Sequence, residues 1–266
     1  MKFKVIMTGS SGNCSLISYK DTNILVDAGF STKKKMDEII EKHLNGFKID
    51  AILITHEHTD HFNPWTGRFA MEYDIPIYLS KRHYENEETR KTKYLSHLDK
   101  RKNEYKEARV IDIEQDTTIY IKDLEIKILN VYHDAKKTLG FIFNNTFGYI
   151  TDCGYISSKI KKELLKVSSL ALEMNYDSKM LMDSERNWQN KLRVIGNFGH
   201  LDNKEAVKFI KFLKNYGKIK QIFTLHPSEH HNSKEILEQE LDEVSKELEV
   251  NIMNRENNNE YEVLVA

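Results

Sequence analysis

The alternation of apolar and polar positions at the start of the chain predicts short strands joined by turns. Strand patterns cover Lys2–Thr8, Cys14–Tyr19 and Asn23–Val26. A Gly- and Ser-rich turn at Gly9–Asn13 separates the first two. The chain therefore begins as a β-meander.

Strand and helix patterns both continue through the rest of the sequence. Further strands are expected at Ile49–Thr55, Pro76–Leu79, Arg109–Ile113, Thr118–Ile121, Leu124–Tyr132, Thr138–Asn144, Phe147–Thr151, Ser169–Met174, Ile219–Leu225 and Tyr261–Val265. Helices are expected at Met36–Leu44, Lys159–Lys166, Asn203–Tyr216 and Lys234–Leu248. Because both halves run from strands to helices, the order fits two mixed sheets packed face to face with helices outside.

A chain of 266 residues is expected to fold as a single domain spanning residues 1–266. The segment near residues 80–108 differs in composition and predicts a charged, helical insert or lid. From Lys81 to Arg109 there are ten Lys or Arg residues against six Asp or Glu. A solvated helical face explains this excess better than a nucleic-acid contact does.

Charge and hydropathy narrow the cellular setting. The formal net charge is -1, so composition gives no overall attraction to nucleic acid. No apolar run reaches the length of a membrane span, and the start lacks the pattern of an export signal, which predicts a cytoplasmic protein without membrane contact. Cys14 and Cys153 are then expected to be reduced thiols.

The cluster His56-Glu57-His58-Thr59-Asp60-His61 directly follows a predicted apolar strand. Burying so many polar groups without partners is costly, so a metal explains them better than a surface His-rich loop does. From an extended segment, His56 and His58 can converge on one ion. Asp60 and His61 enter the next turn, where they can face a second ion.

This cluster resembles the metallo-β-lactamase superfamily, whose pattern is His-x-His-x-Asp-His followed by a distant His, Asp and His. The resemblance implies an α/β (α+β) fold, the αβ/βα four-layer sandwich. It also implies seven ligands for two divalent ions: His56, His58 and His133 on one, Asp60, His61 and His226 on the other, and Asp152 on both. Imidazole with carboxylate suits zinc first, and manganese or iron second.

Two more residues resemble the phosphodiesterase branch of that superfamily. There, a glutamate and a histidine at positions matching Glu173 and His200 are thought to form a proton-donating pair. Such a pair suits a strongly basic leaving alkoxide, although His200 is also compatible with a capping or core role. In the expected mechanism, a hydroxide between the ions, oriented by Asp60, attacks the phosphorus.

Taken over nearly the whole chain, the motifs are similar to those of the YycJ/WalJ family of bacterial metallo-β-lactamase proteins. That likeness implies a DNA exonuclease that cleaves phosphodiesters from a 5′ end. Asp202, Cys153 and Pro227 depart from the usual Ser, Thr and Leu. One alternative is a phosphodiesterase for cyclic nucleotides, with a pocket closed by a partner subunit in a homodimer. The other is an ester or thioester hydrolase, which has no obvious need for the glutamate–histidine pair.

Three smaller features have an open interpretation. The Gly9–Asn13 loop either approaches the metals or a phosphate through its backbone N–H groups, or is a plain hairpin turn. Trp65 and Trp188 either stack on bases or pack in the core or at its rim. His230 and His231 are expected at the surface.

Overall fold

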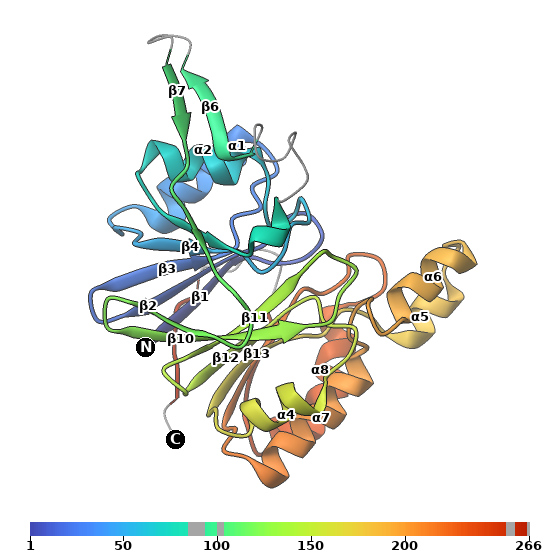
Figure 1. Ribbon diagram of the computed structural model, residues 1–266. Coiled ribbons are helices and arrows are strands. Elements are labelled where there is room, and N and C mark those ends of the chain that lie inside the picture. Colours follow the sequence, from blue (N-terminus) through green and yellow to red (C-terminus); the bar gives the residue numbers. More distant parts are fainter. Residues whose placement is uncertain (85–93, 100–103, 254–258, 265–266) are drawn as a thin grey trace.

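The structure is a computed structural model that describes residues 1–84, 94–99, 104–253 and 259–264. Within these residues, two seven-stranded mixed sheets lie face to face and helices cover their outer surfaces (Figure 1). This arrangement confirms the predicted four-layer sandwich of two helical layers around two sheets.

The first sheet is antiparallel at one side and parallel at the other. Its strands, in spatial order, are β16 (Tyr261–Glu262), β1 (Lys2–Met7), β2 (Cys14–Tyr19), β3 (Thr22–Val26), β4 (Ala51–Leu53), β5 (Ile77–Leu79) and β8 (Val110–Asp112). Strands β3, β4, β5 and β8 are parallel neighbours. Their carboxyl ends therefore meet at one edge, where the histidine cluster begins.

The second sheet has the same division into antiparallel and parallel parts. Its strands, in spatial order, are β15 (Glu249–Asn251), β14 (Gln221–Leu225), β13 (Ser169–Glu173), β12 (Phe147–Ile150), β11 (Thr138–Phe143), β10 (Leu124–Val131) and β9 (Thr118–Ile121). Strands β12 to β15 are parallel, so their carboxyl ends also share one edge.

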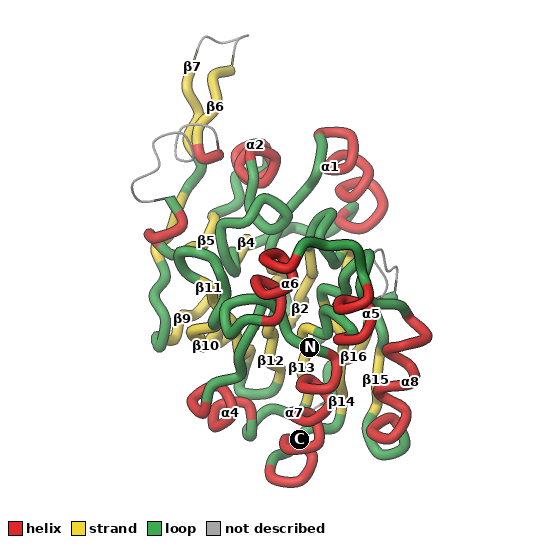
Figure 2. The backbone as a smooth tube through the Cα atoms, turned by 90° about the vertical axis from the view of Figure 1, so that its right-hand side faces the viewer, coloured by secondary structure: helices red, strands yellow, loops and turns green. Residues whose placement is uncertain are grey.

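Helices lie on both outer faces, and two short helices lie at the rim. The first sheet is covered by α1 (Lys33–Ile39), the π-helix η1 (Ile40–Leu44) and α2 (Pro64–Glu72). The second is covered by α4 (Ser158–Leu164), α7 (Asn203–Tyr216) and α8 (Lys234–Ser245). Two more, α5 (Ser178–Asp183) and α6 (Trp188–Ile195), extend away from the sheets, as Figures 1 and 2 both show. No helix in the described ranges is long and apolar enough to cross a membrane.

Three hydrophobic cores hold these layers together. The central core lies between the sheets, where the Phe3 ring packs 4.8 Å from Phe147 and 4.9 Å from Phe223, measured between ring centroids. A second core joins the first sheet to α1 and α2, and a third joins the second sheet to α4, α7 and α8. Because side chains of a strand point alternately to its two faces, each sheet contributes to the central core and to one outer core.

A helical insert or lid was predicted near residues 80–108. This prediction was wrong for most of the part that the structure describes. Lys81–His83 forms a single 3-10 turn, and β6 (Ser96–Asp99) pairs antiparallel with β7 (Glu104–Glu107). This hairpin projects beyond α2 in Figure 1. The two strands read Ser-His-Leu-Asp and Glu-Tyr-Lys-Glu, and such short, polar segments lack the apolar alternation that marks a strand. Residues 85–93 and 100–103 lie outside the described ranges.

Candidate metal centre

The predicted site residues come from loops that follow five strand ends. The cluster His56–His61 follows β4, His133 follows β10, Asp152 follows β12 and His226 follows β14, while Glu173 ends β13. In a sheet of parallel strands, carboxyl ends are where loops from separate strands meet. The fold therefore brings together residues that are up to 170 positions apart in sequence, from His56 to His226.

The loop from His56 to His61 is fixed by contacts with two neighbouring segments. The backbone N–H of Asn13 donates to the Asp60 carbonyl oxygen at 2.8 Å, and that of Ala28 donates to the His61 carbonyl oxygen at 3.1 Å. Gly29 lies so close that a Cβ on it would be 1.8 Å from the Asp60 carbonyl oxygen. A glycine here lets the backbones pack together and hold the ligand loop in place.

Side-chain nitrogen and oxygen atoms gather in two groups that share a carboxylate. In each of these two groups the candidate ligand atoms lie within 4.8 Å of one another; the groups are His56, His58 and His133, and Asp60, His61 and His226. Two further groups overlap with them: His56, His61 and Asp152, and Asp152, Glu173, His200 and His226. Asp152 lies between the first two groups: its Oδ2 is 3.3 Å from His61 Nε2, and its Oδ1 is 3.6 Å from His133 Nε2 and 3.7 Å from His226 Nε2. The geometry thus places together all seven residues that the family resemblance had suggested.

In the group of His56, His58 and His133, two ring nitrogens have no hydrogen-bond partner in the part of the chain that the structure describes. His56 Nε2 and His133 Nε2 are buried and have no hydrogen-bond partner among the described residues. The other nitrogen of each ring is held: His133 Nδ1 lies 2.7 Å from the Gly199 carbonyl oxygen, and His56 Nδ1 lies 3.1 Å from Thr55 Oγ1. A ring that donates from Nδ1 keeps the lone pair of Nε2 free, which is the usual state of a metal-binding histidine.

Asp27 contacts His61, a member of the group of Asp60, His61 and His226. The sequence motifs did not single out this aspartate. Its Oδ2 lies 2.7 Å from His61 Nδ1, and its Oδ1 accepts a hydrogen bond from the Thr55 backbone N–H at 2.8 Å. Although burial lowers the pKa of His61, the carboxylates Asp152, Asp60 and Asp27 raise it well above the ordinary value. The available signal was its position, because Asp27 directly follows an apolar strand at the edge where the cluster begins.

The two carboxylates nearest the ligand groups remain charged. Burial raises the pKa of Asp152, but the surrounding histidines, His226 first, hold it well below its usual range. The same two effects act on Asp60. Burial raises its pKa, but the neighbouring His61 and His226 lower it by more, so the pKa lies below its usual value. Ionised carboxylates beside imidazoles are the donor set that divalent transition metals favour.

Glu173 and His200 form a pair beside this cluster. Glu173 Oε1 lies 2.7 Å from His200 Nδ1, and its Oε2 accepts hydrogen bonds from the backbone N–H groups of Cys153 at 2.7 Å and Leu201 at 3.1 Å. Burial alone raises the pKa of Glu173, yet the neighbouring His200 lowers it to about 2. Burial lowers the pKa of His200, but Glu173 outweighs this and raises it. The imidazole is therefore oriented by its partner, which favours the charged form of the ring.

The sequence left the roles of a glycine-rich loop and two tryptophans open and placed two histidines at the surface. The structure confirms some of these interpretations and contradicts one. The Gly9–Asn13 loop does approach the site, since Asn13 Nδ2 lies 3.0 Å from His61 Nε2. Trp188 is exposed on α6. His230 is at the surface as expected, but the same prediction was wrong for His231, which is buried beside the turn at Ser228.

The two cysteines are buried thiols without a disulfide. Burial raises the pKa of both Cys14 and Cys153, which keeps them protonated. A protonated thiol is a poor metal ligand, so the candidate centre consists of histidines and carboxylates.

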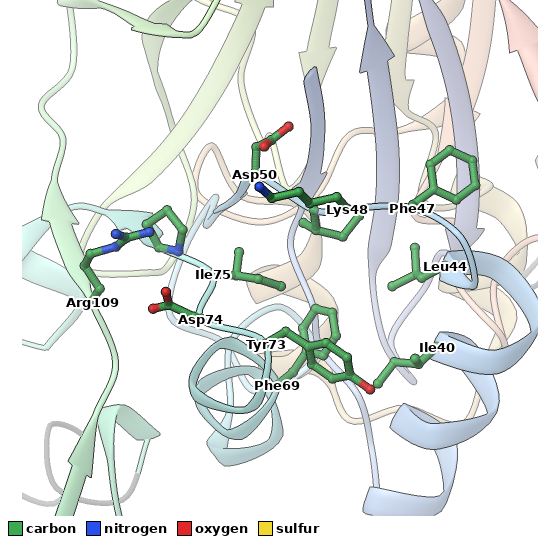
Figure 3. A pocket seen from close by; sticks show the side chains of 12 residues that line it. Ile40, Leu44, Phe47, Lys48, Asp50, Phe69, Tyr73, Asp74, Ile75 and Arg109 are labelled. Carbon is green, nitrogen blue, oxygen red and sulfur yellow. The ribbon is translucent and has the colours of Figure 1, made fainter. Parts of the chain in front are cut away.

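A separate cavity of about 360 Å³ lies away from this centre (Figure 3). Asp50 and Pro76, which directly precede β4 and β5, contribute to its lining. It therefore opens at the amino ends of strands whose carboxyl ends face the histidine cluster. Phe47, Tyr73 and Arg109 also line it, and none of the seven candidate ligands, all within the described ranges, takes part.

Known proteins are similar to this chain in sequence and in fold. A family model described as the beta-lactamase superfamily domain matches residues 22–226. The exodeoxyribonuclease WalJ of Streptococcus pneumoniae serotype 2 is 30% identical over 239 residues, which cover 88% of this chain and 84% of that protein. The exodeoxyribonuclease YycJ of Bacillus anthracis is 29% identical over 250 residues, which cover 93% of this chain and 90% of that protein.

Among solved structures, the metallo-beta-lactamase fold protein YhfI from Bacillus subtilis superposes with a TM-score of 0.69. The two chains are 19% identical, and the match covers 98% of each. At this identity the likeness concerns the fold, which agrees with the two sheets and outer helices described above.

Proposed function

Because this chain is a YycJ/WalJ-like member of the metallo-β-lactamase superfamily, we propose that it is a metal-dependent phosphodiesterase that acts on DNA as an exonuclease. One observation carries the proposal: His200, held by Glu173 at 2.7 Å, lies beside two converging groups of candidate metal-binding side chains. A thioester releases a thiolate, which departs without a proton, whereas a nucleic-acid phosphodiester has a basic alkoxide leaving group that this donor suits.

The side chains fit two divalent ions. The buried His56 Nε2 and His133 Nε2 lack partners that a cation would supply, and Asp152 lies within 3.7 Å of histidines in both groups. One ion would be held by His56, His58 and His133, the other by Asp60, His61 and His226, and Asp152 would contact both. Zinc suits this set first, and manganese or iron second. When bound, such ions neutralise charge on a phosphodiester and lower the pKa of water.

The chain's own residues would position the reactants and deliver a proton. Asp60, whose pKa is lowered, stays ionised and can accept a hydrogen bond from the attacking water molecule, which orients it. His200 would give a proton to the leaving oxygen. Glu173 would hold the His200 ring in one orientation and stabilise its charged form, since the remaining oxygen of Glu173 is fixed by two backbone N–H groups.

Cyclic nucleotides are the second substrate class that the sequence left open. The relatives that match most of the chain are named for DNA cleavage, and no contact in the described residues specifically favours a cyclic substrate. A homodimer and a cytoplasmic location remain predictions.

Replacing Asp60 and His61 together with alanine tests the proposal. The metal-loaded protein is incubated with 5′-phosphorylated DNA, structured RNA and cyclic mononucleotides, and hydrolysis is followed for each. We expect the native chain to cleave DNA and the double variant to fall to the background rate while its circular dichroism spectrum is retained. The matched control is Asp21→Ala with His230→Ala, the same residue types at exposed positions. Hydrolysis that survives in the Asp60 and His61 double variant, or that occurs with cyclic nucleotides alone, would contradict the proposal.

A further inference from the structure

A second cavity, of about 460 Å³, opens next to His200. Its walls come from the segment after Asp152, from the start of α4, from the end of α6 and from one face of α7. His200 is the residue of the candidate centre that lines it, and none of the seven candidate ligands, all of which the structure describes, does so. The cavity is therefore adjacent to the metal groups but distinct from them.

The position of a proton donor fixes where the leaving group lies. Hydrolysis forms a bond from the water oxygen to phosphorus and breaks the bond from phosphorus to the leaving oxygen. That oxygen takes the proton of His200, and the proton of the water passes to solvent. A general acid must lie within about 3 Å of the oxygen that it protonates. The fragment that carries this oxygen must then extend on the His200 side, where the cavity offers space.

One aromatic side chain of this cavity, Tyr155, belongs to a row of three neighbouring rings. Tyr155, which lines the cavity, is 49% exposed, and its ring centroid is 5.9 Å from that of Tyr132. Tyr132 in turn lies 6.2 Å from Phe198, which is 58% exposed. An aromatic ring left open to water does not stabilise a core, but it offers a flat surface on which a nucleobase can stack.

The charges on the walls disfavour an anion as the main occupant. Lys208 Nζ is already paired with Glu205 Oε1 at 2.6 Å, and Lys161 Nζ lies 5.8 Å above the Phe212 ring. Asp202 also lines the cavity, and its carboxylate accepts hydrogen bonds from the backbone N–H groups of Lys204 and Glu205. Apart from His200, the lining has two acidic and two basic side chains, whose charges balance. Its volume falls in the range of sites that enclose one small molecule.

We propose that this cavity receives the leaving nucleoside of the cleaved strand, with its base stacked on Tyr155. The assignment rests on the proposed phosphodiesterase function and names the part of the substrate that the His200 side binds. A site for one nucleoside suits an exonuclease, because the unit that leaves at each cleavage has a single base.

Dinucleotides that lack one base test this assignment. The substrates are thymidylyl-thymidine and two analogues, each abasic at one end, hydrolysed by the native chain and by Tyr155→Ala. In the native chain, removal of the leaving base should lower kcat/KM roughly 5- to 100-fold, the equivalent of one stacked base. Tyr155→Ala should abolish that difference and leave the effect of removing the other base unchanged. Tyr155→Phe should restore it, and Tyr120→Ala, an exposed tyrosine on β9, is the matched control.

A second measurement separates the possible failures. Thymidine is titrated into the metal-free native chain and into Tyr155→Ala by calorimetry, and binding should weaken by a similar factor in the variant. If the native chain cleaves dinucleotides but neither analogue nor variant changes the rate, the nucleoside site is wrong and the phosphodiesterase stands. If the native chain cleaves no phosphodiester, the proposed function fails. Equal thymidine binding by the native chain and Tyr155→Ala would exclude the nucleoside site.

Discussion

Asp27 Oδ2 lies 2.7 Å from His61 Nδ1, and both side chains are fully buried. The carboxylate is itself fixed, because the Thr55 backbone N–H and hydroxyl both donate to it. A ring whose Nδ1–H donates to a carboxylate presents Nε2 to the other side, and here Nε2 faces Asp60 and Asp152 at 3.4 and 3.3 Å. Asp27 therefore sets the orientation of a candidate ligand without touching the ions.

Asp27→Asn should weaken metal binding while keeping the shape of the side chain. The amide would place an N–H group against His61 Nδ1, which disfavours the protonation state in which Nε2 is free. Loss of such a supporting contact typically costs 10- to 100-fold in metal affinity. Calorimetric titration with Zn²⁺ measures the effect, and Asp123→Asn, on the surface, is the control. Equal affinities in the three proteins would show that Asp27 has no orienting role.

His200→Ala should slow DNA cleavage according to how much the leaving group needs a proton. General acid catalysis contributes roughly 10² to 10⁴ in rate, so kcat on DNA should fall within that range. A p-nitrophenyl phosphodiester has a leaving group that departs without protonation, and its hydrolysis should change much less. Glu173→Gln should show the same selectivity with a smaller loss. A uniform decrease on both substrates in His200→Ala would assign the residue to folding or metal binding instead.

The apolar pattern predicted most sheet strands because their burial alternates or is complete. For β2, β9 and α7 the predicted bounds coincide with those observed. Helix α6 was not predicted, although Trp188, Leu192 and Ile195 have helical spacing. In the structure this apolar side is exposed, whereas Lys191 is buried with its Nζ donating to the Met182 and Ser184 carbonyl oxygens. The spacing therefore marks the helix but not the side that packs on the protein.

The candidate site was predictable where ligands are close in sequence, as in His56 to His61. His133, Asp152 and His226 are single residues at strand ends, and only the resemblance to a family pattern selected them. Local sequence contains no information on the approach of Asp27 to His61, since 34 positions separate them and the contact arises from the parallel pairing of β3 with β4. The cavity beside His200 was equally unpredictable, because residues from several separate segments form it.

Gly29→Ala should displace the loop that holds the candidate ligands. The new Cβ would lie 1.8 Å from the Asp60 carbonyl oxygen and 2.8 Å from the His61 nitrogen, so backbone must move. Overpacking of this kind costs about 1–3 kcal/mol. Urea unfolding should show that loss, together with weaker Zn²⁺ binding. Gly196→Ala is the control, because the nearest atom would be 3.2 Å away. Unchanged stability and affinity would mean that the two segments are not packed as described.

Removal of metal should destabilise the chain even though the fold does not depend on a single ion. Without a cation, the buried nitrogens His56 Nε2 and His133 Nε2 have no hydrogen-bond partner among the described residues to offset their desolvation. An ion that binds the folded state alone adds RT ln(1 + [L]/Kd), about 2.7 kcal/mol at a hundredfold excess over Kd. For a chain of this size that corresponds to a rise in Tm of roughly 5–10 °C.

Calorimetric scans of protein treated with a chelator, with and without added Zn²⁺, measure this rise. His133→Ala removes one orphaned nitrogen and one ligand, so it should lose most of the response to Zn²⁺. The Tm of the metal-free protein should fall less than that of the Zn²⁺-loaded protein, because the substitution also removes a buried polar group that has no hydrogen-bond partner within the described ranges. His230→Ala, at the surface, should keep the full response. Since the increment depends on binding to the folded state, a Zn²⁺ response that is the same in His133→Ala as in the native chain would place the ion elsewhere.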